Sequence, residues 1–211
     1  MVKSMDALLV EQGFIFSQVD SSTLDFRNES ELNVEFLKKI LDESNWRHGW
    51  QGRLLTVGDT FWNETEWLTL CAVGGRGRTE MCGYFDEENS VSLEMLDLYI
   101  SGLVRQLNRL GCKTIISCDG EGEHRPNIVF ATVADMERAA LLMAEVGLKH
   151  RVNTARKTLV ILKEREEILG FASLLNGLSE KLNGISTKHL ERVVFENVVE
   201  ELLEIPGSSG H

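Results

Sequence analysis

The chain has 211 residues, of which 43% are hydrophobic and 26% charged, and its formal net charge is −11. This composition is ordinary for a folded globular protein, and the acidic charge excludes bulk electrostatic attraction to nucleic acid. No apolar run approaches the roughly 20 residues of a membrane-spanning helix, so no membrane partner is expected.

The cysteines and the chain ends predict a soluble cytoplasmic protein. No two cysteines have CxxC spacing, which predicts reduced thiols at Cys71, Cys82, Cys112 and Cys118. The first residues lack the basic cluster and apolar block of a secretory signal peptide. Residues 207–211 resemble a linker that leads into a shortened histidine tag, and they are set aside.

Charge divides the chain into three sections. Residues 1–89 sum to −8, residues 90–178 to zero, and the remainder to −3. The acidic run 86–89 marks the first boundary. The predicted organisation is an N-terminal part of helices and a β-meander (1–89), a central module (90–178) and a C-terminal helix (179–206).

The N-terminal part begins with two predicted helices, over 4–12 and 30–44. Strands are expected at 54–57, 67–73 and 81–85, joined by glycine turns into an antiparallel meander. Four tryptophans lie close together in this region, and their side chains are expected to fill the core of the small β-domain rather than to form a stacking surface: Trp46, Trp50, Trp62 and Trp67.

The central module has a regular order of elements. A helix over 93–110 is followed by strands at 113–118 and 127–131, a helix opened by the capping spacing of Thr132 and Asp135, strands at 148–154 and 157–162, and a helix at 164–176. The fold class is therefore α+β. The four strands are expected to share one antiparallel sheet with three helices on one face.

The densest functional chemistry lies between the first two strands of the module. Cys118, Asp119 and His124 are ligand types that hold divalent metal ions, so such an ion is a candidate cofactor. Catalytic roles as acid or base are expected for Asp119, Glu121, Glu123 and His124. The alternative is a polar hairpin tip with solvated acids, because strand neighbours point to opposite faces.

Two basic segments are candidates for phosphate or nucleic-acid contacts. The first is a glycine-rich turn with Arg76 and Arg78, which also fits a simple tight turn because no Lys-Ser/Thr follows it. The second is the hairpin 149–157, whose cations also suit a solvated edge strand. The predicted contact residues are Arg76, Arg78, Arg125, Lys149, Arg151, Arg156 and Lys157.

The last predicted helix covers residues 187–204. Its apolar side chains recur at helical spacing, with Leu190, Val194, Val198 and Leu202 on one stripe. Because such a stripe is costly to leave in water, the helix is expected to bind a protein partner or a second copy of the chain.

The order of elements in 90–178 resembles the core of the LAGLIDADG homing endonucleases. The segment Ile128-Val129-Phe130-Ala131 through Leu148, followed by Thr158-Leu159-Val160-Ile161 and Phe171, is similar to the second half of that module. In the family, the first helix ends in an acidic residue that binds metal. Here that helix ends in Asn108-Arg109-Leu110-Gly111, so the resemblance implies the fold and not the cleavage chemistry.

A shorter resemblance is to the tRNA methyltransferases of wybutosine synthesis. Their Thr-x-Ser-Cys-type strand motif is similar to Thr114-Ile115-Ile116-Ser117-Cys118, and the following helix shares an alanine pair, Ala139-Ala140, and a closing glycine, Gly147. The Ser-Gly-Arg that follows the cysteine in that family is Asp119-Gly120-Glu121 here. The activity is therefore not carried over.

Two classes of function remain open from the sequence. The first is a non-catalytic regulatory or interaction protein that engages a protein partner through its acidic N-terminal half and its C-terminal helix. The second is a protein that acts on nucleic acid or nucleotides through the acidic loop 118–125 and the basic hairpin 149–157.

Overall fold

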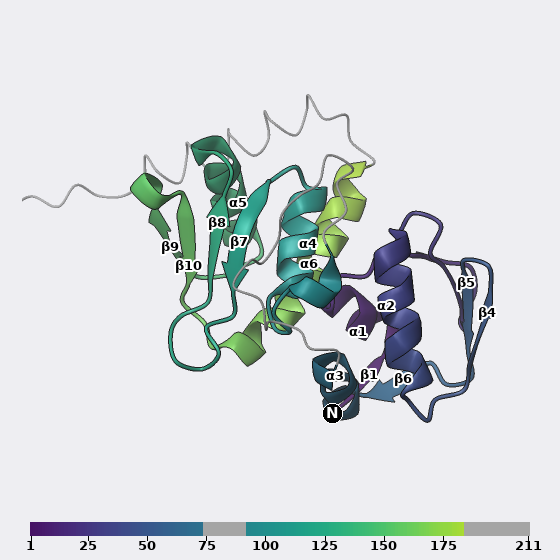
Figure 1. Cartoon of the computed structure of the whole chain (residues 1–211). Helices are drawn as coiled ribbons and strands as arrows, with labels where there is room; N and C mark the ends of the chain where they lie inside the picture. The colour runs from purple at the N-terminus through teal and green to yellow at the C-terminus, as the bar shows by residue number, and fades with distance from the viewer. Residues whose placement is uncertain (74–91, 184–211) are drawn as a thin grey trace, which may run out of the picture.

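The computed structural model describes residues 1–73 and 92–183, and it shows an α+β protein (Figure 1). Helices lie between two separate four-stranded sheets, one from each half of the described chain. The predicted strand at 81–85 and the predicted helix at 187–204 lie outside the described residues.

Residues 1–73 form three helices and six strands. β2, β3, β5 and β4 form an antiparallel sheet in the order β2-β3-β5-β4, and β1 pairs with β6 in a separate ribbon. The bounds are β1 Val2–Ser4, α1 Met5–Glu11, β2 Ser17–Gln18, β3 Thr23–Asp25, α2 Glu31–Asp42, β4 His48–Gln51, β5 Leu54–Val57, β6 Phe61–Asn63 and α3 Glu64–Val73.

The predicted strand at 67–73 is wrong, because this segment belongs to α3. The Asn63 side chain accepts hydrogen bonds from the backbone N–H groups of Thr65 (3.0 Å) and Glu66 (3.2 Å), and so caps the helix. Trp67 and Cys71, four residues apart, are fully buried on one helix face. A short apolar run is compatible with either structure, and the cap selects the helix here.

The central module has its predicted order, with one antiparallel sheet in the order β7-β8-β10-β9. This confirms that the four strands share a sheet. The bounds are η1 Leu93–Met95, α4 Ser101–Arg109, β7 Thr114–Cys118, β8 Asn127–Phe130, α5 Val133–Glu145, β9 His150–Asn153, η2 Thr154–Arg156, β10 Thr158–Ile161 and α6 Arg165–Asn183.

The predicted single helix over 93–110 is broken into η1 and α4. The break lies at Asp97, whose backbone carbonyl accepts from the N–H groups of Ile100 (3.3 Å) and Ser101 (3.1 Å). The apolar periodicity continues across the break because Leu96 and Ile100 still face the core, so periodicity alone predicts one helix.

The three helices of the module do not share one role. α5 packs against β8, β9 and β10, and α4 packs against β7, whereas the main contacts of α6 are with α4 and α1. The prediction that all three cover one face of the sheet therefore holds for α4 and α5 and differs for α6. Among the residues that the structure describes, no helix has the length and apolarity needed to cross a membrane.

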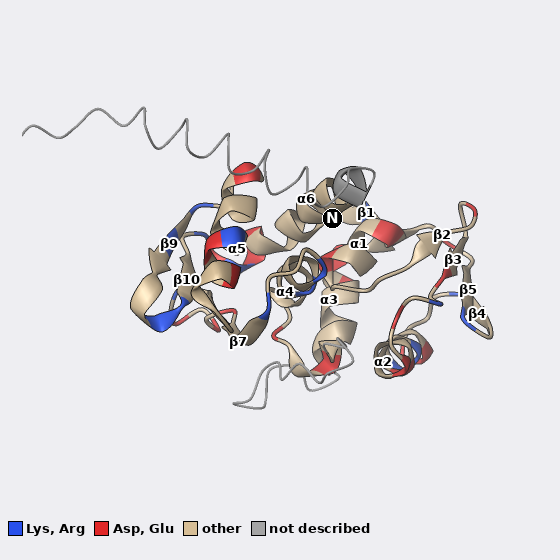
Figure 2. Ribbon diagram, turned by 90° about the horizontal axis from the view of Figure 1, so that it is seen from above, with Lys and Arg blue, Asp and Glu red and all other residues tan. Residues whose placement is uncertain are grey.

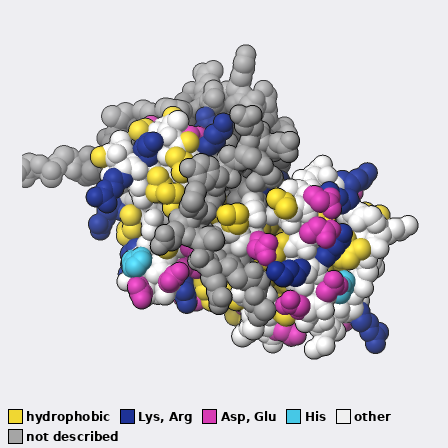
Figure 3. All heavy atoms as spheres, in the orientation of Figure 1, with side chains coloured by type: hydrophobic (Ala, Val, Ile, Leu, Met, Phe, Trp, Pro, Cys, Tyr) yellow, Lys and Arg dark blue, Asp and Glu magenta, His cyan; other side chains and the backbone are white. Residues whose placement is uncertain are grey.

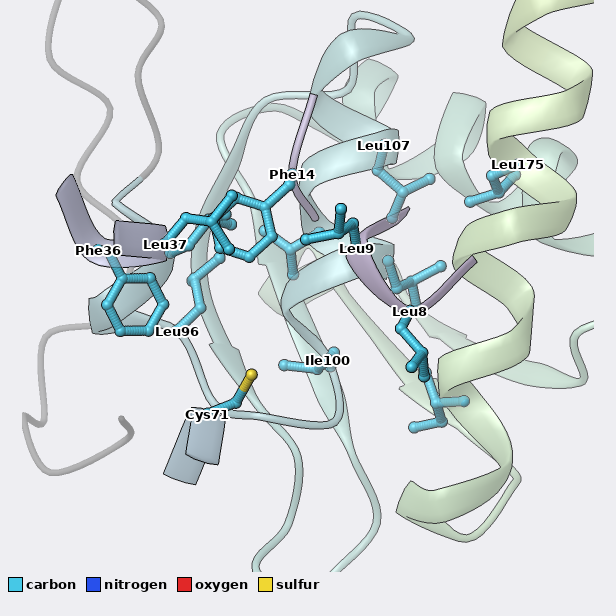
Figure 4. Packing of buried hydrophobic residues seen from close by; sticks show 14 of the residues in the cluster. Leu8, Leu9, Phe14, Phe36, Leu37, Cys71, Leu96, Ile100, Leu107 and Leu175 are labelled. Atoms are coloured by element: carbon cyan, nitrogen blue, oxygen red, sulfur yellow. The ribbon is translucent and has the colours of Figure 1, made fainter. Parts of the chain in front are cut away.

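One cluster of buried hydrophobic side chains runs through both parts of the chain. Figure 4 shows part of this cluster. Leu8 and Leu9 of α1 and Phe14, which follows α1, belong to the same cluster as Leu107 of α4 and Leu175 of α6. The tryptophans belong to this core, as predicted. Trp62 and Trp67 are fully buried and Trp46 stacks on Trp62 with 4.3 Å between ring centroids.

A buried ion pair also joins the two parts. The Glu29 carboxylate accepts from the Arg105 guanidinium at 2.7 Å, and both side chains are almost fully enclosed. Glu29 also accepts from the backbone N–H of Ile15 (2.8 Å) and from the Asn33 amide (3.0 Å), and Asn33 accepts from the N–H of Leu93 (2.9 Å). The network fixes α4 against the segment that leads into α2.

Candidate functional site

The predicted site residues begin where β7 ends. Cys118 is half-buried at the end of the strand, and the next side chain, Asp119, is buried. Gly120 turns the chain with a φ of +83°, and a Cβ there would lie 2.0 Å from the carbonyl oxygen of His124. Only glycine tolerates both conditions, so Gly120 is required for this loop to close.

Asp97, which the sequence analysis placed inside a helix, meets this loop. Its carboxylate accepts from the backbone N–H of Asp119 at 3.0 Å and hydrogen-bonds the Cys118 thiol. The sulfur also accepts from the N–H of Gly120 at 3.3 Å. The break between η1 and α4 therefore places an acidic side chain against the end of β7.

The electrostatics of this cluster favour neutral groups. Burial, with further contributions from Asp119 and Glu121, raises the pKa of the Asp97 carboxyl, although the Asp119 N–H and the Cys118 thiol act in the opposite direction. Burial also raises the pKa of the Cys118 thiol, and the nearby acids add to this effect. A thiolate nucleophile is favoured by the reverse arrangement, so Cys118 is not activated here.

One basic side chain at the start of α6, Arg165, lies beside the cluster. The Arg165 guanidinium stacks over the Tyr99 ring, 4.8 Å from its centroid, and interacts electrostatically with Asp119. Arg125, which was predicted to contact phosphate, forms an ion pair with Glu164 at 2.5 Å. The loop is therefore anchored to α6 by charge.

The remaining predicted catalytic residues do not converge. Glu121, Glu123 and His124 are exposed. Asp119 is buried, and its carboxylate accepts a hydrogen bond from the backbone N–H of Glu121 at 2.9 Å. Within 1–73 and 92–183, no three His, Cys, Asp or Glu side chains gather closely enough to hold a metal ion. The predicted metal ligands Cys118, Asp119 and His124 thus do not form a common site, and the loop has the geometry of a polar hairpin tip.

The basic hairpin is formed by β9, η2 and β10, as expected. Lys157 adopts a left-handed conformation with a φ of +50° and donates to the Ala131 carbonyl at 3.0 Å. Lys149, Arg151 and Arg156 are exposed and form no ion pair with another described residue. Figure 2 shows lysine and arginine positions in blue around β9 and β10.

The sheet has two different faces. Ile128, Phe130 and Leu159 are buried on the face covered by α4 and α5. The strand pairing places two rows on the opposite face, here called the outer face: Ile116, Val129, Thr158 and Asn153 in one row, and Cys118, Asn127, Val160 and Arg151 in the other.

Apolar and basic groups meet on this outer face. Ile116 is 46% exposed, and Val129 and Val160 are half-buried at the centre. The part of the molecule that holds the sheet shows hydrophobic side chains among lysines and arginines (Figure 3). Consecutive apolar residues in β8 (Ile128–Phe130) and β10 (Leu159–Ile161) could have indicated this face, because neighbouring residues of a strand point to opposite sides.

Not all predicted site residues can be located, and some residues of the site were not predicted. Arg76 and Arg78 lie outside the described residues, as does the 187–204 segment. Asp97, Arg165 and Glu164 were not predicted as site residues, and no sequence motif marks them. Comparisons with protein-family models, with curated proteins and with solved structures found no match for this chain.

Proposed function

We propose that the protein is a non-catalytic interaction protein that binds an acidic, amphipathic protein segment on the outer face of its β7-β8-β10-β9 sheet. The observation that carries the proposal is the combination on one surface of an apolar centre with an uncompensated basic edge. The proposal keeps the interaction class expected from the sequence and places the docking surface on the module.

The apolar centre favours a protein partner. Ile116, Val129 and Val160 form neighbouring positions across three strands, and exposed apolar side chains that lie together mark interaction surfaces more often than scattered ones do. The eight outer-face residues include no aromatic side chain, whereas surfaces that bind single-stranded nucleic acid stack bases on aromatic rings.

The basic edge sets the charge of the partner. Arg151 lies in the same row as Val160, and Lys149 and Arg156 flank β9 at its two ends. Oppositely charged groups around an apolar centre accelerate association and fix its register more than they add affinity. Residues 187–204 of this chain have the required character, since their sequence combines an apolar stripe with a net charge of −3.

Site-specific photo-crosslinking tests this proposal. A photoreactive phenylalanine analogue replaces Ile116 on the outer face or, as the control, Leu32, which is 66% exposed on α2. We expect cross-links from position 116 to an acidic amphipathic segment of this chain or of another protein. These cross-links should decrease strongly in an Arg151→Glu/Arg156→Glu background. Equal cross-linking from both positions would contradict the proposal.

Nucleic-acid binding is the second candidate, because three exposed cations, Lys149, Arg151 and Arg156, lie within eight residues in and directly before β9 and η2. Fluorescence anisotropy with single-stranded and double-stranded oligonucleotides tests it at low and moderate salt. This candidate would be favoured if added salt weakened binding, and if the affinity of the Arg151→Glu/Arg156→Glu variant depended less steeply on salt concentration. No binding at low salt would exclude it.

A further inference from the structure

A pocket of about 550 Å³ lies between α1 and α6. One wall is formed by α1 and the segment 14–18, and the other by α6 and the end of α4. Its volume lies in the range of small-molecule sites, roughly 300–1,000 Å³. None of the groups discussed for the sheet lines it.

The α6 wall is built from small and polar residues. Ser173, Asn176 and Gly177 occupy positions i, i+3 and i+4 and therefore share one helix face. Gly177 lies inside a helix of 19 residues, where glycine costs about 1 kcal/mol relative to alanine. A Cβ at Gly177 would meet no atom within 4 Å, so the space in front of it belongs to the pocket.

Two buried polar atoms near this wall lack a partner. Ser173 lines the pocket, and its buried hydroxyl makes no hydrogen bond within the described structure. The amide nitrogen of Gln106, a fully buried residue outside the pocket lining, also makes none with a described residue. Buried polar groups are satisfied in the great majority of cases, which points to an additional hydrogen-bonding group beside α6.

The polar lining carries both signs of charge. The Arg109 guanidinium donates to Asn176 at 2.8 Å and to Gln106 at 2.9 Å, and these two bonds fix its position on the wall. Asp6, from the first turn of α1, lines the same pocket and forms no ion pair with a described residue. A ligand with a carboxylate and an amino group matches this lining.

The rest of the lining is apolar. Val10, Phe14, Ile15 and Phe16 present aliphatic and aromatic surface, and Phe14 is anchored in the core. We infer that the pocket binds a small zwitterion with an apolar side chain, of the chemical class of the free hydrophobic amino acids. Arg109 and Asn176 receive its carboxylate next to Ser173, Asp6 receives its ammonium group, and Val10 and Phe16 contact its side chain.

Thermal unfolding of the full chain with defined probes tests this inference. The probes are the proteinogenic L-amino acids, the amides of the same amino acids, which lack the carboxylate, and inorganic phosphate. A probe at about ten times its Kd should raise the Tm of the wild-type protein by about 3 to 6 °C. We expect this rise for hydrophobic amino acids and not for their amides or for phosphate.

Two glycine variants on the same helix locate the binding. Gly177→Leu fills the pocket, whereas Gly170→Leu adds the same side chain at a position that also has open space around its Cβ but does not line the pocket. The Tm rise should persist in Gly170→Leu and disappear in Gly177→Leu. Ser173→Ala, a small change that preserves the fold, should reduce it severalfold.

The remaining outcomes overturn the inference. They are a rise of equal size in both glycine variants, a rise with phosphate alone, or no rise with any amino acid. Because none of these residues belongs to the outer face, the result is independent of the cross-linking experiment.

Discussion

At the scale of single residues, the most unusual group is the Asp97 carboxyl. It is buried against two further acids, yet it holds the end of β7 by accepting from the Asp119 N–H. Burial penalises its ionised form, while the hydrogen bonds favour it. The side chain therefore organises the loop but costs stability when it is charged.

The first prediction concerns the pH dependence of this cost. Because burial raises the pKa of Asp97 in the folded state above its ordinary value of 3.8, the folded chain binds this proton more tightly than the unfolded chain. Its contribution to stability is largest below pH 3.8 and is lost as pH rises through the folded-state pKa. Asp97→Asn, which stays neutral and can still accept from Asp119, should gain stability relative to wild type as pH rises.

Urea unfolding at several values between pH 3.5 and 7.5 measures this difference, and about 1.4 kcal/mol corresponds to one unit of pKa. Asp20→Asn is the control of opposite sign. Hydrogen bonds from the Ser22 backbone, first among several, lower the pKa of Asp20, so this variant should lose relative stability as pH rises. A flat difference for Asp97→Asn would contradict the role assigned to burial.

At the scale of elements, the sequence predicts what local signals encode. The helix α5 begins where Thr132 and Asp135 indicate it, because the Thr132 hydroxyl accepts from the Asp135 N–H. The positions of the four strands of the module along the chain follow from short apolar runs. By contrast, Asp97, at the helix break, hydrogen-bonds a residue 22 positions away, and no local pattern contains such a contact.

The candidate site was harder to predict for the same reason. The sequence marks the segment 118–120 because functional side chains are dense there. The roles of these residues, however, depend on Asp97 and Arg165, which are distant in sequence. Spacing along the chain cannot show which acids become buried. Glu121 and His124 are exposed at a tight turn, whereas Asp119 is buried, and their spacing along the sequence does not distinguish them.

The second prediction tests the tight turn itself. Gly120 and Gly122 have nearly equal φ angles, +83° and +81°, but a Cβ would clash only at Gly120, 2.0 Å from the His124 carbonyl oxygen. Gly122→Ala should cost about 1–2 kcal/mol, the penalty for a left-handed residue. Gly120→Ala should cost clearly more, because the backbone must also move.

Chemical unfolding of the two alanine variants compares these costs directly. The glycines share one loop and have nearly equal φ angles, so the difference between the two variants reports the close approach of Gly120 to His124. Equal losses of stability would mean that the loop relaxes freely and that its conformation is not fixed by Gly120.

At the scale of the whole molecule, the N-terminal part and the central module pack closely together, although their different net charges suggested two separate parts. A Cβ at Gly102 of α4 would lie 2.1 Å from the Glu11 carbonyl oxygen, so α4 approaches the end of α1 without an intervening side chain. The Glu29–Arg105 pair lies in the same interface. The hydrophobic cluster continues across it, so we expect the two parts to unfold as one cooperative unit.

The last prediction follows from that cooperativity. All four tryptophans lie between residues 46 and 67, so tryptophan fluorescence reports the N-terminal part, whereas far-UV circular dichroism reports the whole chain. The two unfolding curves should coincide in the wild-type protein. Arg105→Met leaves the buried Glu29 carboxylate without its guanidinium and should shift both curves together, by about 3–5 kcal/mol. Arg125→Met, which breaks the exposed pair with Glu164, should cost less than about 1 kcal/mol.

Restoring neutrality with Glu29→Gln in the Arg105→Met background should recover part of the lost stability, because the glutamine side-chain carbonyl can still accept from the Ile15 N–H. If fluorescence changed first and circular dichroism later, the two parts would be separate folding units, and the ion pair would be a contact between domains rather than part of a single core.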